Sequence, residues 1–227
     1  MQALRELLIT DALDVRLDAA ALDLARIEHP DLDSMPWLEE LDRIALAVAD
    51  RTPDLSNGFK FVTSLNAYLF EELGFHGNET FYYDPRNSCL NDVLAFRTGI
   101  PITLAVVYME VSRRLAKPVY GIGAPGHFIV EYDDGDFTAY IDPFRKGRML
   151  SREQCIAMVT EYLGSALAES ALARATPKQI LVRMLRNLEG AYVRQSRFDK
   201  ALIVGELLQL AGIPPSGSLP RARTSEN

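Results

Sequence analysis

The sequence predicts an α+β fold in which a small antiparallel sheet lies between two helical regions. Apolar residues recur at helical spacing within residues 1–80 and again after the middle of the chain. Between these regions, three short segments at 118–123, 127–132 and 137–142 are rich in Val, Ile, Tyr and Phe, a composition typical of strands. Because the helices and the strands form separate runs along the chain, the α+β class is favoured over an alternating α/β fold.

The expected domain organisation follows from the same pattern. Residues 1–80 form an N-terminal helical subdomain, and residues 81–150 form the core that contains the sheet. Residues 151–212 form a C-terminal helical region. The tail at 213–227 is rich in Pro, Ser and charged residues, so we expect it to be disordered.

The composition argues against several classes of function. Of the 227 residues, 48% are hydrophobic and 24% are charged, the balance of a soluble globular protein. The net charge of −7 argues against a nucleic-acid partner, which would need a basic face. No apolar run reaches the roughly 20 residues that span a bilayer, so we expect no membrane partner. The N-terminus lacks the basic start and apolar centre of a signal peptide, which predicts a cytoplasmic protein. The oligomeric state is not determined by the sequence.

Side chains that commonly hold metal ions are few and scattered. The two cysteines, Cys89 and Cys155, lack the spacing of a metal cluster or a disulfide scaffold. In a reducing compartment both are expected to be thiols, and Cys155 lies in an apolar stripe typical of a core. His29 and His76 have no partners at ligand spacing. The sequence therefore predicts no metal and no cofactor.

Amphipathic helices are predicted in the N-terminal region. Residues 17–28, 33–51 and 55–75 each place apolar side chains on one face. Gly74 is suited to cap the third of these helices, because a helix often ends on a glycine with positive φ.

The most apolar stretch, residues 100–115, is predicted to be a buried helix. It is apolar on nearly all sides until Glu110. A shorter helix over residues 87–97 precedes it, with Asn87 or Ser88 as the N-cap. The buried helix is expected to pack against the sheet.

His127 and Asp142 are the strongest candidates for catalytic residues. Each lies at an end of a predicted strand, and the loop at residues 133–136 joins the two strands into a hairpin that could bring the side chains together. A carboxylate that binds one imidazole nitrogen fixes the tautomer and leaves the other nitrogen to face a nucleophile. The pair is thus two thirds of a Cys-His-Asp site. A His–Asp hydrogen bond could also serve only to hold the hairpin together.

The residues around this pair form a longer pattern. It comprises "YYDPRNSCLNDVLAFRTGIPITLAVVYMEVSRRLAKP", "PGHFIVEY" and "IDPF", with "LDLARIEHPDLD" and "FKFVTSLNAYLFEELGFHGN" upstream. These segments resemble the SirB-one family of transglutaminase-like proteins, and the resemblance extends to about residue 212. It implies a papain-like transglutaminase fold, in which His127 and Asp142 match the His and Asp of the superfamily.

The same resemblance implies that the nucleophile is missing. In the superfamily a Gly-x-Cys segment leads into the buried helix, and this pattern places Gly99 on the glycine and Pro118 on a proline at the far end. The cysteine position then falls on Pro101. Proline begins a helix well, because its missing N–H would have no partner there anyway. It has no side chain that can attack a carbonyl.

Two other side chains are candidate nucleophiles. Thr103 follows two positions later, but a threonine needs strong activation and its helical phase differs from that of Pro101. Cys89 lies in the first turn of the short helix, where a modest fall in its pKa is reasonable. It would reach His127 only if that helix folded back over the site, and free cysteines are most often small buried hydrophobes.

A polar loop before the buried helix is a candidate binding rim. Its members are Tyr82, Tyr83, Asp84, Arg86, Asn87 and Arg97. Together they could recognise a peptide or a carboxylate. The sequence favours a loop that satisfies itself, in which Asp84 caps a turn, Arg86 pairs with a nearby acid and Asn87 caps the helix.

The end of the helical region is predicted to be a helical hairpin. Five of its residues fall where a tetratricopeptide repeat has packing residues: Leu188, Ala191, Tyr192, Phe198 and Ala201. Only one repeat is visible, and such units normally need neighbours. An ordinary helical hairpin docked on the core is an equal alternative.

These features together predict a degenerate, non-catalytic transglutaminase-like protein. It would act as a cytoplasmic protein-binding or regulatory module through the cleft around His127, Asp142 and residues 82–87, with a protein or peptide partner. The alternative is an amide-bond enzyme, a cysteine peptidase, amidase or transglutaminase. In it the Cys89 thiolate attacks a carbonyl, His127 moves the proton and Asp142 orients the ring. A third alternative is a scaffold that works through its C-terminal hairpin.

Overall fold

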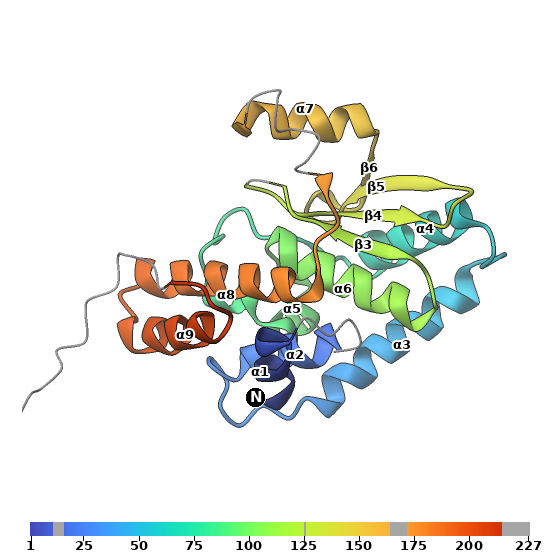
Figure 1. Ribbon diagram of the computed structural model, residues 1–227. Coiled ribbons are helices and arrows are strands. Elements are labelled where there is room, and N and C mark those ends of the chain that lie inside the picture. Colours follow the sequence, from blue (N-terminus) through green and yellow to red (C-terminus); the bar gives the residue numbers. More distant parts are fainter. Residues whose placement is uncertain (11–15, 125, 164–171, 215–227) are drawn as a thin grey trace, which may run out of the picture.

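The computed structural model describes residues 1–10, 16–124, 126–163 and 172–214. Within these residues it has the predicted α+β architecture (Figure 1). Of the tail predicted to be disordered, residues 213–214 are described and residues 215–227 lie outside the described residues. In the described part of the chain, no helix is long and apolar enough to cross a bilayer.

The N-terminal region is helical, as predicted. Its helices are α1 (Gln2–Ile9), α2 (Leu17–Ala25), α3 (Met35–Arg51) and α4 (Gly58–Asn66). A π-helical segment, Ala67–Glu72, continues α4 and ends before Gly74, which has the positive φ of 74° expected of a C-terminal cap. Helix α1 and the change to π-helical geometry were not predicted.

The core contains two small sheets. In the larger one, β3 (Val119–Ile122), β4 (Ile129–Asp133), β5 (Thr138–Asp142) and β6 (Arg148–Leu150) are antiparallel neighbours in chain order. The first three match the predicted strands, whereas β6 was not predicted. A second sheet pairs β1 (His76–Gly77) with β2 (Thr98–Gly99) in parallel, and it too was not predicted.

Helices enclose the larger sheet on both sides. Figure 1 shows α7 (Arg152–Leu163) on one side and α6 (Pro101–Arg114) on the other. Cys155 of α7 is buried in a small cluster with apolar side chains of the sheet, Ile122, Ile129 and Tyr140. Ser151 and Gln154 form a capping box at the start of α7.

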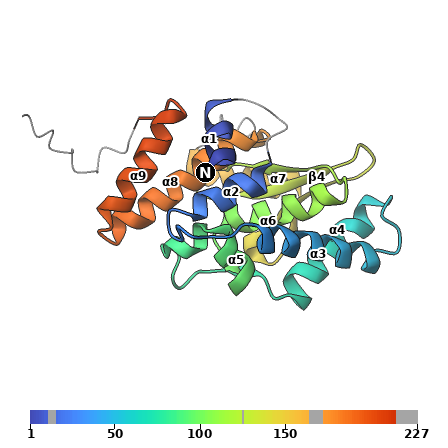
Figure 2. The same cartoon turned by 90° about the horizontal axis from the view of Figure 1, so that it is seen from below.

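The remaining helices cover the far side of α6. Helices α2, α3 and α5 (Leu90–Phe96) pack against α6, and α1 packs against α2 (Figure 2). The C-terminal hairpin of α8 (Pro177–Arg194) and α9 (Phe198–Leu210) lies at one end of the molecule (Figure 1). This hairpin confirms the predicted helical pair.

Helix α6 is buried almost all round, as its apolar sequence predicts. Every residue from Pro101 to Ser112 is buried except Met109. Burial extends to Glu110, which is 3% exposed. The charged side chains of α6 are Glu110, Arg113 and Arg114, and all three lie towards its C-terminal end.

A network of buried charges fixes that end of α6 to α2. Asp18 of α2 is 0% exposed and accepts hydrogen bonds from Arg16 at 2.8 Å and from Arg114 at 2.7 Å. Glu110 accepts from Arg113 at 2.8 Å and from Arg114 at 3.1 Å. Burial disfavours the charged Asp18, but the hydrogen bonds from the arginines outweigh it and lower the pKa of Asp18 to about 2. Burial and the nearby Asp18 raise the pKa of Glu110.

We expect Asp18→Asn to lower the free energy of unfolding by about 2 kcal/mol at pH 7. The folded-state pKa of Asp18 is about 2, below its usual value of 3.8, and one pKa unit corresponds to about 1.4 kcal/mol. A carboxylate with a depressed pKa stabilises the fold above its unfolded pKa and loses this effect as the pH falls through the folded value. The difference between wild type and variant should therefore shrink between pH 4 and pH 2.

Urea unfolding at several pH values measures this difference. The exposed Glu39 of α3 provides a control, since Glu39→Gln should change the stability little at any of these pH values. Equal stability of wild type and Asp18→Asn at pH 7 would show that the buried network contributes nothing.

Candidate functional site

The β4–β5 hairpin brings His127 and Asp142 together, as predicted. Val130 of β4 is opposite Ile141 of β5 in the antiparallel register. Continuing this register places Asp142, the last residue of β5, opposite Ile129, the first residue of β4, and His127 lies two residues before Ile129. Nε2 of His127 lies 2.8 Å from Oδ2 of Asp142, a hydrogen bond. Because a carboxylate only accepts, Nε2 carries the proton, which leaves Nδ1 as the free face of the neutral ring.

The Asp142 carboxylate is held by the backbone that follows it. Asp142 is 0% exposed and caps the short 3-10 helix Pro143–Arg145. Its Oδ1 accepts hydrogen bonds from the backbone N–H groups of Phe144 and Arg145. With Oδ1 occupied in this way, Oδ2 is directed to the imidazole.

One aromatic ring lies against the His127 imidazole, and a second ring lies behind the first. The ring of Phe144 lies edge-on to the imidazole, with 6.1 Å between centroids, and Tyr82 lies edge-on to Phe144 at 6.2 Å. The His127 side chain retains 13% of its exposure. The imidazole is therefore accessible at one edge of a largely aromatic surface.

An arginine of the C-terminal hairpin supports the loop that carries His127. Arg183 of α8 donates hydrogen bonds to the backbone carbonyls of Ala124 at 2.7 Å and His127 at 2.8 Å. Its guanidinium also lies 5.3 Å from the centre of the Phe128 ring. Sequence reasoning missed Arg183, because nothing at its position in the chain indicates a contact with a loop more than fifty residues earlier.

The first turn of α6 contains Pro101 and Thr103, and the hydroxyl of Thr103 is already hydrogen-bonded. Pro101 takes the first helical position, where proline is tolerated well. The hydroxyl of Thr103, which is 0% exposed, donates to the Asn87 carbonyl at 2.7 Å and accepts from the Ile100 N–H at 3.2 Å. Both bonds are structural, so the geometry gives no support to Thr103 as a nucleophile.

The structure places Cys89 beside a different His–Asp pair. Its sulfur, together with a ring nitrogen of His29 and a carboxylate oxygen of Asp92, forms a group of atoms within 4.8 Å of one another. Burial and the nearby Asp92 carboxylate raise the pKa of Cys89 well above its usual value. No hydrogen bond joins Cys89 to His127 in the described part of the chain. The enzyme alternative requires Cys89 beside His127 and Asp142. Among the described residues, no contact joins Cys89 to that pair.

Cys155 is equally unsuited to attack. It is fully buried among apolar side chains, and burial raises its pKa to about 11, with a smaller contribution from Asp142. Its interpretation as a core residue is confirmed.

Comparison with known proteins identifies the family of this fold. A family model described as "Transglutaminase-like superfamily" matches residues 36–186, more than half of the chain. The chain belongs to this superfamily. The match spans α3 to α8, so it includes the buried helix, the larger sheet and both members of the His127–Asp142 pair.

Curated proteins from bacteria and from animals are similar to this chain. A UPF0162 protein of Xylella fastidiosa (strain 9a5c) is 40% identical over 190 residues, which cover 82% of this chain and 68% of that protein. A UPF0162 protein of Pseudomonas aeruginosa is 32% identical over 171 residues, covering 74% of this chain and 62% of that protein. The human F-box only protein 21 is 32% identical over 133 residues, covering 55% of this chain and 20% of that protein. No solved structure matches.

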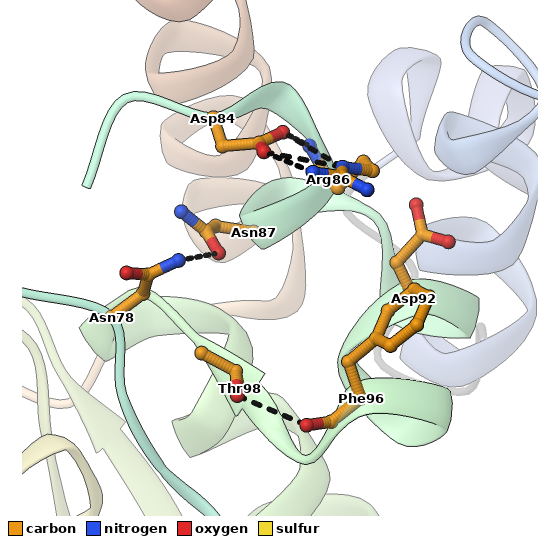
Figure 3. A pocket seen from close by; sticks show the side chains of 7 residues that line it. All are labelled: Asn78, Asp84, Arg86, Asn87, Asp92, Phe96 and Thr98. Carbon is orange, nitrogen blue, oxygen red and sulfur yellow. Dashed lines mark hydrogen bonds and ion pairs between the residues drawn. The ribbon is translucent and has the colours of Figure 1, made fainter. Parts of the chain in front are cut away.

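A polar pocket lies in this transglutaminase-like core between the loop before α5 and strand β2 (Figure 3). Its volume is about 210 Å³. Its lining residues are Asn78, Asp84, Arg86, Asn87, Asp92, Phe96 and Thr98. Three of the six predicted rim residues, Asp84, Arg86 and Asn87, thus lie together.

The predicted rim loop satisfies most of its own polar groups. Asp84 caps the 3-10 helix Pro85–Ser88 and pairs with Arg86 at 2.7 Å, as Figure 3 shows. Both contacts match the self-satisfied loop that the sequence favoured. Asn87 differs from the prediction: its side chain donates to the carbonyls of Phe81 and Tyr82. The N-cap of α5 is Cys89, so the prediction of Asn87 or Ser88 was wrong.

The other three rim residues lie apart from the pocket. Tyr82 lies edge-on to Phe144, on the side of the molecule that carries His127. Tyr83 lies under the guanidinium of Arg194, 4.0 Å from its ring centre. Arg97 turns away to pair with Glu40 of α3 at 2.5 Å. The six residues therefore do not form one rim.

We expect Asp142→Asn to reverse the tautomer of His127. The backbone N–H groups of Phe144 and Arg145 would hold the amide oxygen, so the amide NH₂ would face the ring and Nε2 would become an acceptor. The proton of the neutral ring would then move from Nε2 to Nδ1. Nitrogen-15 NMR of the histidine side chains measures this change, and the signals of His29 provide an internal control. A wild-type ring protonated on Nδ1 would contradict the geometry.

Proposed function

We propose that this chain is a degenerate transglutaminase-like protein that binds a protein or peptide partner without catalysing acyl transfer. The observation that carries the proposal is Pro101 at the first position of α6. The resemblance to the SirB-one family puts the superfamily's thiol at this position. A proline there preserves the helix start and removes the group that would attack a carbonyl.

The state of the cysteines supports the same proposal. Acyl transfer by a thiol needs a thiolate that the substrate can reach. Cys89 and Cys155 are both 0% exposed, and burial raises the pKa of each. Neither thiol has the low pKa and the exposure of a reactive cysteine. Two buried free thiols are also typical of a reducing compartment, which supports our proposal of a cytoplasmic location.

The surface around His127 is suited to binding a peptide. The imidazole offers one polar edge, and Tyr82 and Phe144 offer aromatic rings beside it. Aromatic side chains are enriched among residues that dominate protein interfaces. Arg183 holds the backbone of the loop, so the surface is formed before a partner arrives.

The relation to F-box only protein 21 favours a modular role. The similar segment takes up 20% of the human protein. A domain that is a small part of a longer chain commonly works as a module within it. The tetratricopeptide-like interpretation of α8 and α9 offers a second surface, because Phe198, Leu202 and Ile203 of α9 are between 38% and 44% exposed.

We expect His127→Ala to weaken capture of the partner by about tenfold or more. Truncating a central interface residue commonly costs more than about 1.4 kcal/mol, which corresponds to tenfold in affinity. The measurement is affinity capture with the tagged full chain, followed by titration of the recovered partner. Cys89→Ala should bind like wild type, because a binding surface at His127 needs no thiol.

A variant of the second surface is the matched control. Leu202→Asn changes an exposed residue of α9 and should leave capture unchanged. Loss of capture in Leu202→Asn, with full capture by His127→Ala, would assign binding to the hairpin and contradict the proposal. Cleavage or cross-linking of an amide substrate that Cys89→Ala abolishes would contradict the absence of catalysis.

A further inference from the structure

We propose that Cys89, His29 and Asp92 form a binding site for a single zinc-type transition-metal ion. The site is separate from the His127–Asp142 pair and does not depend on the proposed function. Its three side chains come from two segments that are far apart in the sequence. His29 follows α2, whereas Cys89 and Asp92 lie at the start of α5.

The geometry of the three ligand atoms carries the proposal. The Cys89 sulfur, one His29 nitrogen and one Asp92 oxygen all lie within 4.8 Å of one another. Nε2 of His29 is 2.7 Å from Oδ2 of Asp92. Small shifts of these side chains would place all three atoms about 2.0–2.3 Å from one central ion, which are typical distances for zinc ligands.

The chemistry of the donors selects the metal. A thiolate and an imidazole are ligands of Zn²⁺ and related transition metals, and an Asp oxygen completes common zinc sites. Calcium and magnesium are excluded because they require oxygen ligands. Three protein ligands leave a fourth tetrahedral position for water or an added ligand.

The local charge favours a cation. Asp92 is 7% exposed, and among the described residues no arginine or lysine pairs with it. The two other nearby carboxylates already have cationic partners, since Glu28 binds Arg197 and Lys200, and Asp84 binds Arg86. The partner of the Asp92 carboxylate is the His29 ring at 2.7 Å, which is a cation only when it is protonated. A bound metal ion would supply a permanent positive charge beside Asp92 and stabilise the Cys89 thiolate.

The side-chain amide of Asn91 lies beside the three ligands. Its nitrogen orients Asp92, and its oxygen lacks a hydrogen-bond donor among the described residues. Nδ2 of Asn91 donates to Oδ1 of Asp92 at 3.2 Å and thereby orients the carboxylate, as outer-sphere groups do in metal sites. The other atom of the same amide, Oδ1 of Asn91, is buried and has no hydrogen-bond partner within the described chain. A water molecule on the ion would bring a donor into this region.

The polar pocket provides a route to the site. Asp92 is part of the wall of the pocket of about 210 Å³ (Figure 3). Asn78, Asn87 and Thr98 also line it and offer polar contacts to a hydrated ion. His29 retains 36% of its side-chain exposure. An ion could therefore enter although Cys89 itself is fully buried.

Metal titration of the purified, reduced full-length chain tests the proposal. We expect one equivalent of Zn²⁺ to bind, with release of the thiol proton because zinc binds the thiolate. Co²⁺ in place of zinc should give the near-ultraviolet charge-transfer band of a thiolate ligand. Zinc should also raise the midpoint of thermal unfolding, because a ligand that binds only the folded chain stabilises it.

Variants at matched positions decide the outcome. Cys89→Ala should abolish the thiolate band and lower the zinc affinity at least about tenfold, whereas Cys155→Ala, at the other buried cysteine, should bind like wild type. His29→Gln changes a partly exposed side chain and should lower the affinity likewise. If Cys89→Ala fails to fold, the His29→Gln variant still tests the proposal. Absence of stoichiometric zinc binding in wild type would overturn the proposal, as would a band that persists in Cys89→Ala or an unchanged affinity in His29→Gln.

Discussion

The burial of α6 on nearly every side is the constraint on which the rest of the structure depends. A helix with no solvent face favours apolar side chains along its middle, and the charged side chains of α6 lie at its C-terminal end. At the C-terminal end, Glu110 and Arg114 meet the buried Asp18 of α2. At the N-terminal end, Pro101 begins the helix and the Thr103 hydroxyl ties it to the Asn87 carbonyl. In our proposal, Pro101 starts the helix at the position from which a thiol would act in this superfamily.

The described residues include two His–Asp pairs, and each lacks a feature that the other has. His127 and Asp142 have the orientation of a catalytic pair, with the carboxylate fixed by backbone N–H groups and one ring edge accessible. Within the described residues, no thiol forms a hydrogen bond with this pair. His29 and Asp92 have a thiol, Cys89, but it is fully buried and its pKa is raised. We propose that the same residue types serve recognition at one place and metal binding at the other, because their burial and the neighbouring charges differ.

Local patterns in the sequence predicted the main elements and the His127–Asp142 pair. The buried helix follows from an uninterrupted apolar run, and the hairpin follows from two strand-like segments around the loop at residues 133–136. The two-residue strands β1 and β2 could not be predicted, because each is too short to show a period and their pairing joins distant residues. Strand β6 was missed for a similar reason, since it has three residues.

The surroundings of the candidate residues were harder to predict than the residues themselves. Cys89 and His29 are sixty positions apart, so their spacing gives no indication of a shared site. Arg183 is likewise an ordinary helical residue until α8 docks beside the His127 loop. Arg97 was expected near the other rim residues, but its left-handed backbone conformation, with φ of 57°, turns the chain at the end of α5. Contacts of this kind arise from tertiary packing and have no local pattern.

The most direct measurement of the central claim is the reactivity of a thiol introduced by Pro101→Cys. If Pro101 occupies the place of the superfamily nucleophile, the introduced thiol should react with iodoacetamide near neutral pH at least about tenfold faster than the buried cysteines of wild type. A tenfold gain corresponds to a fall of about one unit in the pKa of the thiol, which raises the thiolate fraction tenfold. Adding His127→Ala should remove most of this gain. A rate in Pro101→Cys that equals the wild-type rate, or one that His127→Ala leaves unchanged, would contradict the claim that the chain retains a catalytic pair beside a missing nucleophile.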